Sequence, residues 1–311
     1  MFENFKVMDI ETSGAVIHLR SGGKGPPLLL LHGNPLTHVS WHKIANELAK
    51  NFSVIATDLR GYGDSSAPDP GENNINFSFR AMAQDQVEVM ETLGYNQFFA
   101  AGIDRGARTL HRMCLDHPDR VIKAAILDIL PNYYVWTHAS KEWATKSWHW
   151  LFMIQPPDFP EKMMASVPPE WFMEKKISKP GIGLKPFTKD AFAEYVRCFN
   201  EKTIRASCAD YRACATCDFE IDTADKDKKV SCPILVLWGA KSHTGRVHGD
   251  VLAVWKNYGV SVTGGPINCG HYITEEAPEE TYGWFMRFFT ELDSNGSRQN
   301  GAKKCLMDIC S

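Results

Sequence analysis

The sequence predicts an α/β protein in which a mostly parallel, doubly wound sheet carries an inserted helical cap. Apolar strand-like segments alternate with helical segments from residue 28 to 127 and again from 229 to 292, as in a parallel sheet with helices on both faces. Between these two parts lies a stretch rich in Trp, Met, Phe and Pro that has helical periodicity. The 311 residues are ample for one large domain with such an insertion.

Each predicted element follows from a local pattern of apolar residues. Alternating apolar residues between Phe5 and Leu19 predict an antiparallel strand pair, because alternate side chains of a half-buried strand face the core. Short apolar runs predict buried strands, and longer segments with helical spacing predict helices. The expected strands are Leu28–Leu31, Ser53–Asp58, Phe98–Ala101, Val121–Leu127, Pro233–Leu237 and Val260–Ile267. The expected helices are Trp41–Lys50, Arg80–Leu93, Thr109–Asp116 and Pro278–Leu292.

We expect the core to be built from two separate parts of the chain, residues 1–130 and 223–292, with the helical cap at 131–222. The charged run Asp222–Lys229 is expected to form an exposed return linker, and the polar tail 293–311 is expected to be disordered. Doubly wound sheets bind ligands at the carboxyl ends of their strands. A cap inserted after a strand is therefore expected to cover the binding site.

Composition argues against several classes of partner. The net charge is −3 and there is no basic stripe, so nucleic acid is not an expected partner. No apolar run approaches the roughly 20 residues of a membrane-spanning helix, and Met1–Asn4 lacks the start of a secretory signal. We therefore expect a cytoplasmic protein, with no membrane partner, that acts on a small molecule.

The nine cysteines do not indicate disulfides or a metal site. An odd count without a secretory signal favours reduced thiols. Cys214 and Cys217 form a lone CxxC without a second half-site, and Cys114 is expected to fill the core beneath its helix. No metal and no organic cofactor is expected.

The stretch Gly102–Gly106 places Asp104 where a nucleophile would stand. It joins a predicted strand to a predicted helix, and so tight a turn needs small residues on both sides of the nucleophile. A carboxylate attacks an amide or ester carbonyl poorly, but it displaces leaving groups from saturated carbon well. Asp104 therefore predicts hydrolysis of an alkyl group through an ester intermediate.

An aspartyl nucleophile needs a base that activates water and an acid that orients this base. His271 follows the last predicted strand, which is where the base of such a triad comes in the chain. Asp128 ends the strand beside that of the nucleophile and is the expected acid, although an N-cap role also fits this position. Asp250 is held as a reserve candidate.

The segment His32–Pro35 directly follows the strand Leu28–Leu31. A loop in this place contributes one backbone N–H to an oxyanion hole, and the residue after the nucleophile contributes the other. The expected donors are Asn34 and Arg105, which would act when water attacks the aspartyl ester. The side-chain amide of Asn34 is a further candidate donor to a leaving halide.

Two arginines argue for an acidic substrate. Arg105 and Arg108 lie at the start of the helix that follows Asp104, where the helix N-terminus already attracts anions. Two guanidinium groups there are predicted to bind a substrate carboxylate and to keep Asp104 ionised. The alternative is that they pair only with Asp104 or with acidic residues of the cap.

From about Gly25 to Phe289, these features resemble the haloacetate (fluoroacetate) dehalogenases of the α/β-hydrolase superfamily. The Asp-Arg-Gly-Ala-Arg elbow at 104–108 is the more specific match, whereas His32–Pro35 and Asp58–Ser65 are shared with epoxide hydrolases and haloalkane dehalogenases. The other matching segments are Leu127–Pro131, Trp148–Trp150, Asp210–Arg212 and Gly270–His271.

The resemblance implies an α/β-hydrolase fold, a possible homodimer and a set of residue roles. It implies that Asp104 is the nucleophile, His271 the base and Asp128 its orienting acid, with Arg105 and Arg108 holding the carboxylate. It also implies that His149, Trp150 and Tyr211 of the cap donate to the leaving halide. Without the resemblance, Trp148, Trp150 and Tyr211 would be assigned to the apolar core of the cap.

Two positions depart from the family pattern. The family usually has histidine before the nucleophile, where this chain has Ile103. The cap stretch Lys175–Gly181 lacks a tryptophan that the resemblance leads us to expect. The first change predicts an altered rate or pocket polarity, and the second predicts room for a substrate larger than fluoroacetate.

The sequence thus predicts hydrolytic dehalogenation of a short 2-haloacid, converting haloacetate and water to glycolate and halide. Epoxide hydrolysis is one alternative, because it uses the same Asp–His–Asp chemistry. It would normally need a pair of cap tyrosines, and an arginine directly after the nucleophile argues against it. A non-catalytic small-molecule receptor of the same fold is the other alternative, motivated by Ile103.

Overall fold

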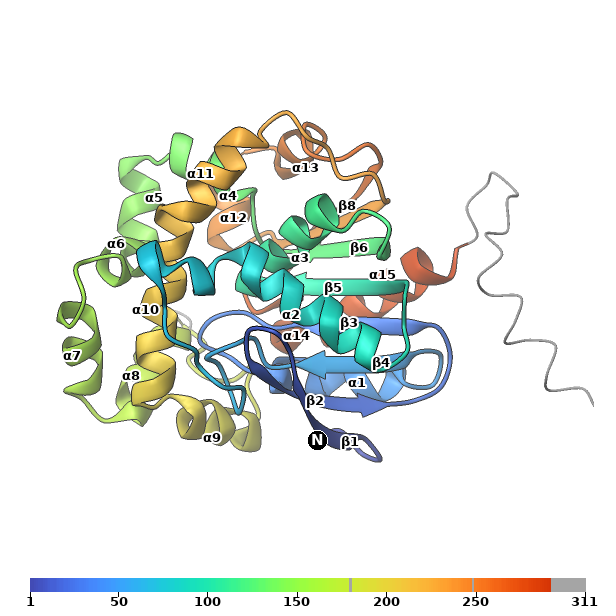
Figure 1. Cartoon of the computed structure of the whole chain (residues 1–311), viewed down its shortest axis with the longest axis horizontal. Coiled ribbons are helices and arrows are strands. Elements are labelled where there is room, and N and C mark those ends of the chain that lie inside the picture. Colours follow the sequence, from blue (N-terminus) through green and yellow to red (C-terminus); the bar gives the residue numbers. More distant parts are fainter. Residues whose placement is uncertain (179–180, 248, 292–311) are drawn as a thin grey trace, which may run out of the picture.

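One eight-stranded sheet forms the centre of the protein (Figure 1). The computed structural model describes residues 1–178, 181–247 and 249–291. The strand order is β1-β2-β4-β3-β5-β6-β7-β8; β1 and β2 are antiparallel to their neighbours and the rest of the sheet is parallel. The strands are β1 Lys6–Glu11, β2 Val16–Gly22, β3 Pro27–Leu31, β4 Ser53–Thr57, β5 Phe98–Ile103, β6 Val121–Leu127, β7 Ile234–Gly239 and β8 Val262–Ile267.

Helices cover both faces of this sheet. Helices α1 (His42–Leu48) and α15 (Pro278–Thr290) pack together on one face, and α2 (Phe79–Thr92) and α3 (Arg105–Asp116) pack together on the other (Figure 1). Leu28–Leu31 of β3 are fully buried, which is why this strand is a continuous apolar run rather than an alternating one. The predicted doubly wound α/β fold is confirmed.

In the described part of the chain between β6 and β7, eight helices form the cap, on the side where the parallel strands end (Figure 1). Polar side chains begin several of them: Ser140, Thr188 and Asn200 each accept a hydrogen bond from a backbone N–H of the first turn. The helices are α4 Asn132–Thr137, α5 Lys141–Lys146, α6 Trp148–Met153, α7 Phe159–Ala165, α8 Pro169–Ile177, α9 Lys189–Cys198, α10 Glu201–Ala215 and α11 Cys217–Ala224.

Short helices complete the loops at this edge of the sheet. They are η1 His38–Trp41, η2 Glu72–Phe77, α12 His243–Val247, α13 Val251–Trp255 and α14 Ile273–Glu276. The helix predicted at Trp41–Lys50 is α1, which η1 precedes. Helix α14 directly follows His271, so the loop that carries this histidine is short and bounded by β8 and a helix.

The predicted return linker is wrong in its first part. Helix α11 continues to Ala224, and Asp222 and Asp225 form ion pairs with the buried Arg112 of α3. Asp222 and Asp225 are partly buried, whereas the other residues of the predicted linker are exposed. The charged residues at its start therefore attach the end of the cap to the core instead of facing solvent.

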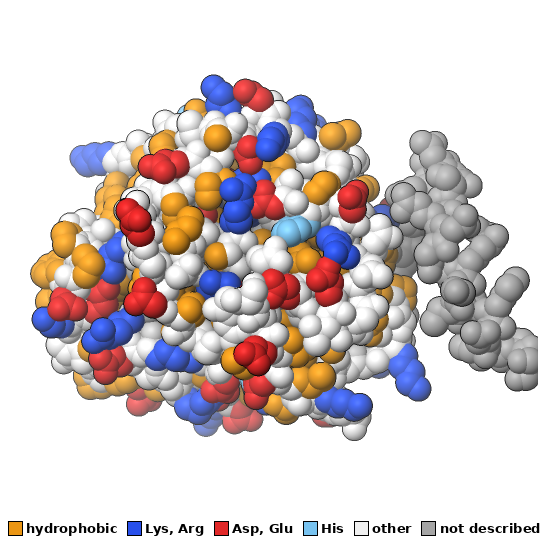
Figure 2. All heavy atoms as spheres, viewed as in Figure 1, with side chains coloured by type: hydrophobic (Ala, Val, Ile, Leu, Met, Phe, Trp, Pro, Cys, Tyr) orange, Lys and Arg blue, Asp and Glu red, His pale blue; other side chains and the backbone are white. Residues whose placement is uncertain are grey.

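Several sequence-based expectations fall outside the described residues. These are the disordered tail at 293–311 with Cys305 and Cys310, the last residue of the helix predicted to end at Leu292, and the cap positions Lys179 and Pro180. In the described part of the chain, no helix is long and apolar enough to cross a membrane. Acidic and basic side chains are interspersed on the face drawn in Figure 2, in keeping with the small net charge.

The described cysteines form no disulfide with one another, and Cys114 is buried in the core as expected. Cys214 and Cys217 belong to no cluster of metal-ligating side chains within that part of the chain. The cluster that does occur there joins His18, His38 and Asp58. These groups already hydrogen-bond to protein atoms, since His38 contacts Asp58 and His18 contacts Asp9.

Candidate active site

Asp104 stands at a sharp turn between β5 and α3. Its backbone has φ +51° and ψ −118°, a conformation that non-glycine residues rarely adopt and that is typical of strained functional sites. A Cβ atom on Gly106 would collide with the backbone oxygens of Leu31 and His32, and one on Gly102 would collide with Gly106. The small residues that the sequence places around Asp104 are therefore required by close backbone packing.

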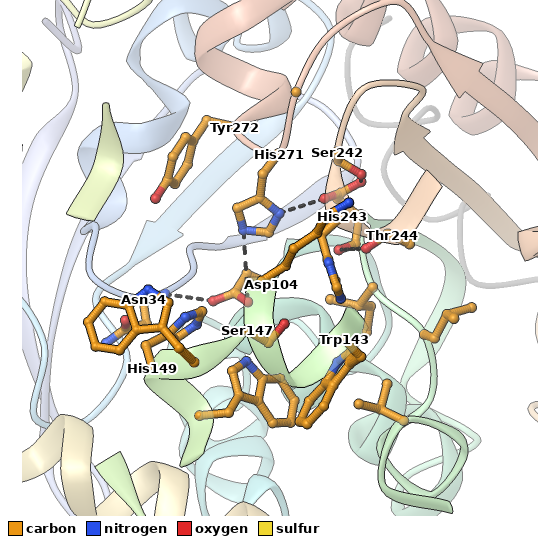
Figure 3. Close-up of a pocket in the computed structure, with 18 of the residues that line it drawn as sticks. Asn34, Asp104, Trp143, Ser147, His149, Ser242, His243, Thr244, His271 and Tyr272 are labelled. Carbon is orange, nitrogen blue, oxygen red and sulfur yellow. Dashed lines mark hydrogen bonds and ion pairs between the residues drawn. The ribbon is translucent and has the colours of Figure 1, made fainter. Parts of the chain in front are cut away.

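His271 lies between two carboxylates (Figure 3). Its Nδ1 is 2.5 Å from Oδ2 of Asp128, and its Nε2 is 3.9 Å from Oδ2 of Asp104. Because an ionised carboxylate only accepts hydrogen bonds, Nδ1 carries the proton and Nε2 is left to act as a base. The structure thus brings together the three side chains that the sequence selected for a triad.

Asp128 is fixed in place by several donors. Its Oδ1 accepts hydrogen bonds from the backbone N–H of Gly239 at 2.9 Å and from Oγ of Ser242 at 2.7 Å, which leaves Oδ2 to His271. The hydroxyl of Thr244 donates to the Asp128 carbonyl. The reserve candidate, Asp250, instead caps α13 by accepting from the Ala253 N–H.

The backbone N–H of Asn34 donates to Oδ1 of Asp104 at 2.9 Å, which is the arrangement expected of an oxyanion hole (Figure 3). Gly33 makes this approach possible, because a Cβ there would collide with the Cβ of Asp104. The side chain of Asn34 differs from expectation. Its amide donates to Ser207 at 3.0 Å and to Tyr62 at 3.4 Å, so both of its N–H groups are already used and neither is left for a halide.

The Asp104 carboxylate is buried but ionised. Burial alone would raise its pKa, yet the neighbouring His271, Arg105 and Arg108 and the Arg105 backbone hydrogen bond outweigh it. Together they hold the pKa of Asp104 below its usual value. The carboxylate is therefore in the form that a nucleophile requires.

Arg105 pairs with an acidic residue of the cap, which is the alternative that the sequence analysis left open. It is fully buried, and its Nε and Nη2 donate to the carboxylate of Asp210 on α10, while Nη2 also donates to the Asp210 carbonyl. Burial alone would lower the pKa of Arg105, but Asp210 outweighs it and keeps the pKa well above its usual value. The guanidinium does not line the cavity. Through Asp210, Arg105 joins the elbow helix to the cap, while its Nη1 has no hydrogen-bond partner among the described residues. Binding of a substrate carboxylate by both arginines stays a prediction.

Arg108 is the arginine that lines the cavity beside Asp104. Its Nη1 donates to the Leu130 carbonyl at 3.0 Å, and its guanidinium lies 4.7 Å from the centre of the Trp150 ring. Its Nε has no hydrogen-bond partner among the described residues. Arg108 is held in position and retains donor capacity for an anion.

The three predicted halide donors of the cap line the same cavity. Tyr211 of α10 contacts both of the others through edge-on rings, with ring centres 5.8 Å from His149 and 5.6 Å from Trp150 of α6. Burial and the nearby cations lower the pKa of His149 well below its usual value, so its ring is neutral. Trp148 also lines the cavity, although its side chain is half exposed.

The cavity has a volume of about 360 Å³ and is rich in basic side chains. The acidic residues of its lining are Asp104 and Asp128. The basic residues are Arg108, Lys146, Lys175, Lys176 and Lys241. Sequence reasoning missed the lysines, because a lysine on a cap helix is indistinguishable from any solvated one until the helix is placed. Figure 3 shows Trp143, Ser147, His149 and His243 around the same space.

Ile103, the residue that departs from the family pattern, is buried in the core and is not among the residues lining the cavity. It occupies the end of β5 and pairs in register with Leu127 of β6. A change in pocket polarity from this residue would therefore have to act indirectly, through the position of Asp104.

The Arg105–Asp210 pair leads to a prediction about stability. Replacing Asp210→Asn leaves the buried guanidinium without its counter-charge, and we expect the free energy of unfolding to fall by about 3 kcal/mol. Chemical denaturation measures this change. The exposed Glu201–Arg205 pair on the same helix provides the control, since Glu201→Gln should cost less than about 1 kcal/mol. Equal effects of the two substitutions would contradict the structural role of Asp210.

Comparison with known proteins agrees with this geometry. The family model of the alpha/beta hydrolase fold matches residues 26–168. The fluoroacetate dehalogenase of Burkholderia sp is 37% identical over 94% of this chain and 97% of its own length. The soluble epoxide hydrolase of Corynebacterium sp. (strain C12) is 30% identical over 90% of this chain and 96% of its own.

A putative alpha/beta hydrolase from Nostoc sp PCC 7120 has a solved structure that is 51% identical to this chain. It superposes with a TM-score of 0.91 and covers 94% of this chain and all of its own. At this coverage the likeness extends over both the sheet and the cap. In this chain the sheet positions the elbow residue Asp104 together with His271 and Asp128, as described above. The chain therefore belongs to the α/β-hydrolase family.

Proposed function

We propose that the protein hydrolyses the carbon–halogen bond of a short 2-haloacid. The observation that carries this proposal is an ionised aspartate at the elbow, facing a cavity whose other charged side chains are mostly cations. An aspartyl nucleophile suits displacement at saturated carbon, and the basic lining suits a substrate that is itself an anion. The similarity to a fluoroacetate dehalogenase supports the same substrate class.

In the first step, an oxygen of Asp104 attacks the halogen-bearing carbon. A carbon–oxygen bond forms, the carbon–halogen bond breaks, and the halide leaves with the bonding electron pair. Arg108 holds the substrate carboxylate, which places the carbon in line with Asp104. His149, Trp150 and Tyr211 offer N–H and O–H donors to the departing halide.

In the second step, His271 takes a proton from water, and the resulting hydroxide attacks the Cγ of Asp104. The negative charge then develops on the Asp104 oxygen that accepts from Asn34, where two backbone N–H groups stabilise it. Collapse breaks the ester bond, the proton on His271 passes to the departing 2-hydroxyacid, and the acid formed at Asp104 releases a proton to solvent. Asp128 stabilises the protonated His271 meanwhile.

Epoxide hydrolysis is the rival function that a specific observation favours. The similarity to a soluble epoxide hydrolase and the cavity position of Tyr211 both support it. An epoxide needs an acid at its oxygen, and a cap that supplies two tyrosines is well suited to this. Among the described lining residues the second tyrosine is Tyr272, which follows His271 in the core rather than the cap. An uncharged epoxide also leaves the basic lining without a role.

The proposal is tested by halide release from fluoroacetate and chloroacetate. We expect turnover of both acids by the wild type and a loss of roughly 10⁴-fold or more in Asp104→Asn, because the nucleophile is removed. Asp119→Asn serves as the control, because this exposed aspartate lies in the turn after α3 and does not line the cavity, so the variant should keep full activity. Turnover of styrene oxide without any halide release from the acids would replace this proposal with epoxide hydrolysis.

Replacing His271→Gln separates the two steps. The first step needs no base, so we expect one halide per active site followed by arrest at the aspartyl ester. Mass spectrometry of the intact protein after treatment with chloroacetate should show the added carboxymethyl group. The double variant with Asp104→Asn must not gain this mass. A His271→Gln protein that turns over continuously would contradict the assignment of the base.

Arg108 decides the discrimination between charged and uncharged substrates. Removing its charge in Arg108→Met should lower kcat/KM for chloroacetate by roughly 10- to 100-fold, the effect of one charge-assisted hydrogen bond. Chloroacetamide has the same shape without the charge and should be affected much less. The ratio of kcat/KM for the two compounds is the measurement, and an unchanged ratio would mean that Arg108 does not bind the carboxylate.

A further inference from the structure

Lys176 is a cation of the cavity that the two chemical steps do not use. It lies on α8 of the cap and lines the cavity together with Asp104 and Arg108. Its Nζ is enclosed and has no hydrogen-bond partner among the described residues. An ammonium group in this state is costly to bury, and such groups are characteristic of ligand sites.

The other cap lysines that line the cavity differ from Lys176 in their exposure and in their ion pairs. The side chains of Lys146 and Lys175 are 43% and 58% exposed, and they form ion pairs with Glu142 and Glu174. Water and these carboxylates satisfy them. Lys176 has neither, so it is the lysine whose charge a ligand would compensate.

The titratable groups that act on Lys176 come from three elements. They are Asp104 at the elbow, His149 of α6 and Cys208 of α10. Burial keeps His149 neutral and raises the pKa of the Cys208 thiol, so neither supplies a negative charge. Asp104 is the one anion of the three, and it is already engaged by Asn34 and faced by His271.

The cavity is also larger than a haloacetate requires. Its volume of about 360 Å³ corresponds to roughly a dozen water molecules, whereas a haloacetate has five non-hydrogen atoms. Arg108 approaches this space from α3 of the core and Lys176 approaches it from α8 of the cap. Two cations from opposite layers and the extra volume suit an acid that carries two carboxylates.

We propose that the cavity takes 2-halodicarboxylic acids, such as 2-chlorosuccinate, with Arg108 on the carboxylate next to the halogenated carbon and Lys176 on the distal one. This inference rests on the proposed dehalogenation and specifies its substrate class. The reaction follows the same two steps: 2-chlorosuccinate and water give malate, chloride and a proton. The distal carboxylate supplies the partner that Lys176 lacks.

The test compares both enantiomers of 2-chlorosuccinate with those of 2-chlorobutanoate, which has the same carbon chain but no distal acid. We expect the wild type to prefer chlorosuccinate in kcat/KM by roughly tenfold or more, and Lys176→Met to abolish this preference. Lys162→Met is the control, because this cap lysine is 78% exposed and does not line the cavity. Lys176→Met removes an unpartnered buried charge, so we expect it to unfold at the same or a higher temperature.

A pH profile gives a second readout. Burial lowers the pKa of Lys176 to about 8, so its charge is present below that pH and is lost as the pH rises through it. The ratio of kcat/KM for chlorosuccinate to that for chlorobutanoate should therefore fall above pH 8, and it should be flat in Lys176→Met. Taking the ratio cancels any pH dependence that the two substrates have in common.

The possible outcomes separate this inference from the proposed function. Chloride release from chloroacetate together with an equal effect of Lys176→Met on both four-carbon acids would overturn the inference and leave the function standing. Absence of chloride release from every acid would overturn the function. In that case calorimetric binding of malate against 2-hydroxybutanoate decides the role of Lys176. If malate binds no more tightly than 2-hydroxybutanoate, or binds equally well to Lys176→Met, Lys176 does not bind a distal carboxylate.

Discussion

The protein depends on keeping one buried carboxylate ionised at a strained turn. Asp104 has a backbone conformation that costs energy, and its side chain is enclosed where burial favours the neutral acid. The surrounding groups offset both costs. Glycines allow the backbones of β3, β5 and α3 to approach one another, so that the Asn34 N–H can reach Oδ1, and the nearby cations stabilise the charge.

The cap is joined to this turn through the residue that follows the nucleophile. Arg105 begins α3, and its ion pair with Asp210 connects the elbow to α10 at a fully buried point. Tyr211 is the next residue of α10, and its ring lies 4.3 Å from the Arg105 guanidinium. Tyr62 donates to Asp210 as well, at 2.7 Å. The position of a predicted halide donor is thus determined by an ion pair whose other member is part of the elbow.

The sequence predicts this architecture well where the signal is local. The strand runs, the elbow, Asp128 at the end of β6 and His271 after β8 are each recognisable from a few neighbouring residues. It predicts poorly what depends on contacts between distant segments. The partner of Arg105 is 105 positions away, and the Asn34 amide contacts a residue 173 positions away. Asp210 was included in a matching motif, but nothing in its neighbourhood reveals that it faces an arginine.

The same limit explains why the lysine of the cavity could not be foreseen. Lys175 and Lys176 are adjacent and chemically identical in the sequence, and only the packing of α8 makes one exposed and encloses the Nζ of the other. Ile103 is the opposite case. Its departure from the family pattern is plain in the sequence, but its side chain is buried away from the residues that line the cavity. Local sequence thus identifies unusual residues better than it identifies the surfaces they contribute to.

Charge movement connects the elbow to the cap in the proposed reaction. When Asp104 attacks, its negative charge is neutralised in the ester and reappears on the departing halide. The cations that hold Asp104 ionised lie on the core side, so they favour the charge before the attack and oppose its departure. A favourable barrier therefore requires compensation on the cap side, where neutral donors must receive the halide. His149, Trp150 and Tyr211 line the cavity from the cap and supply such donors.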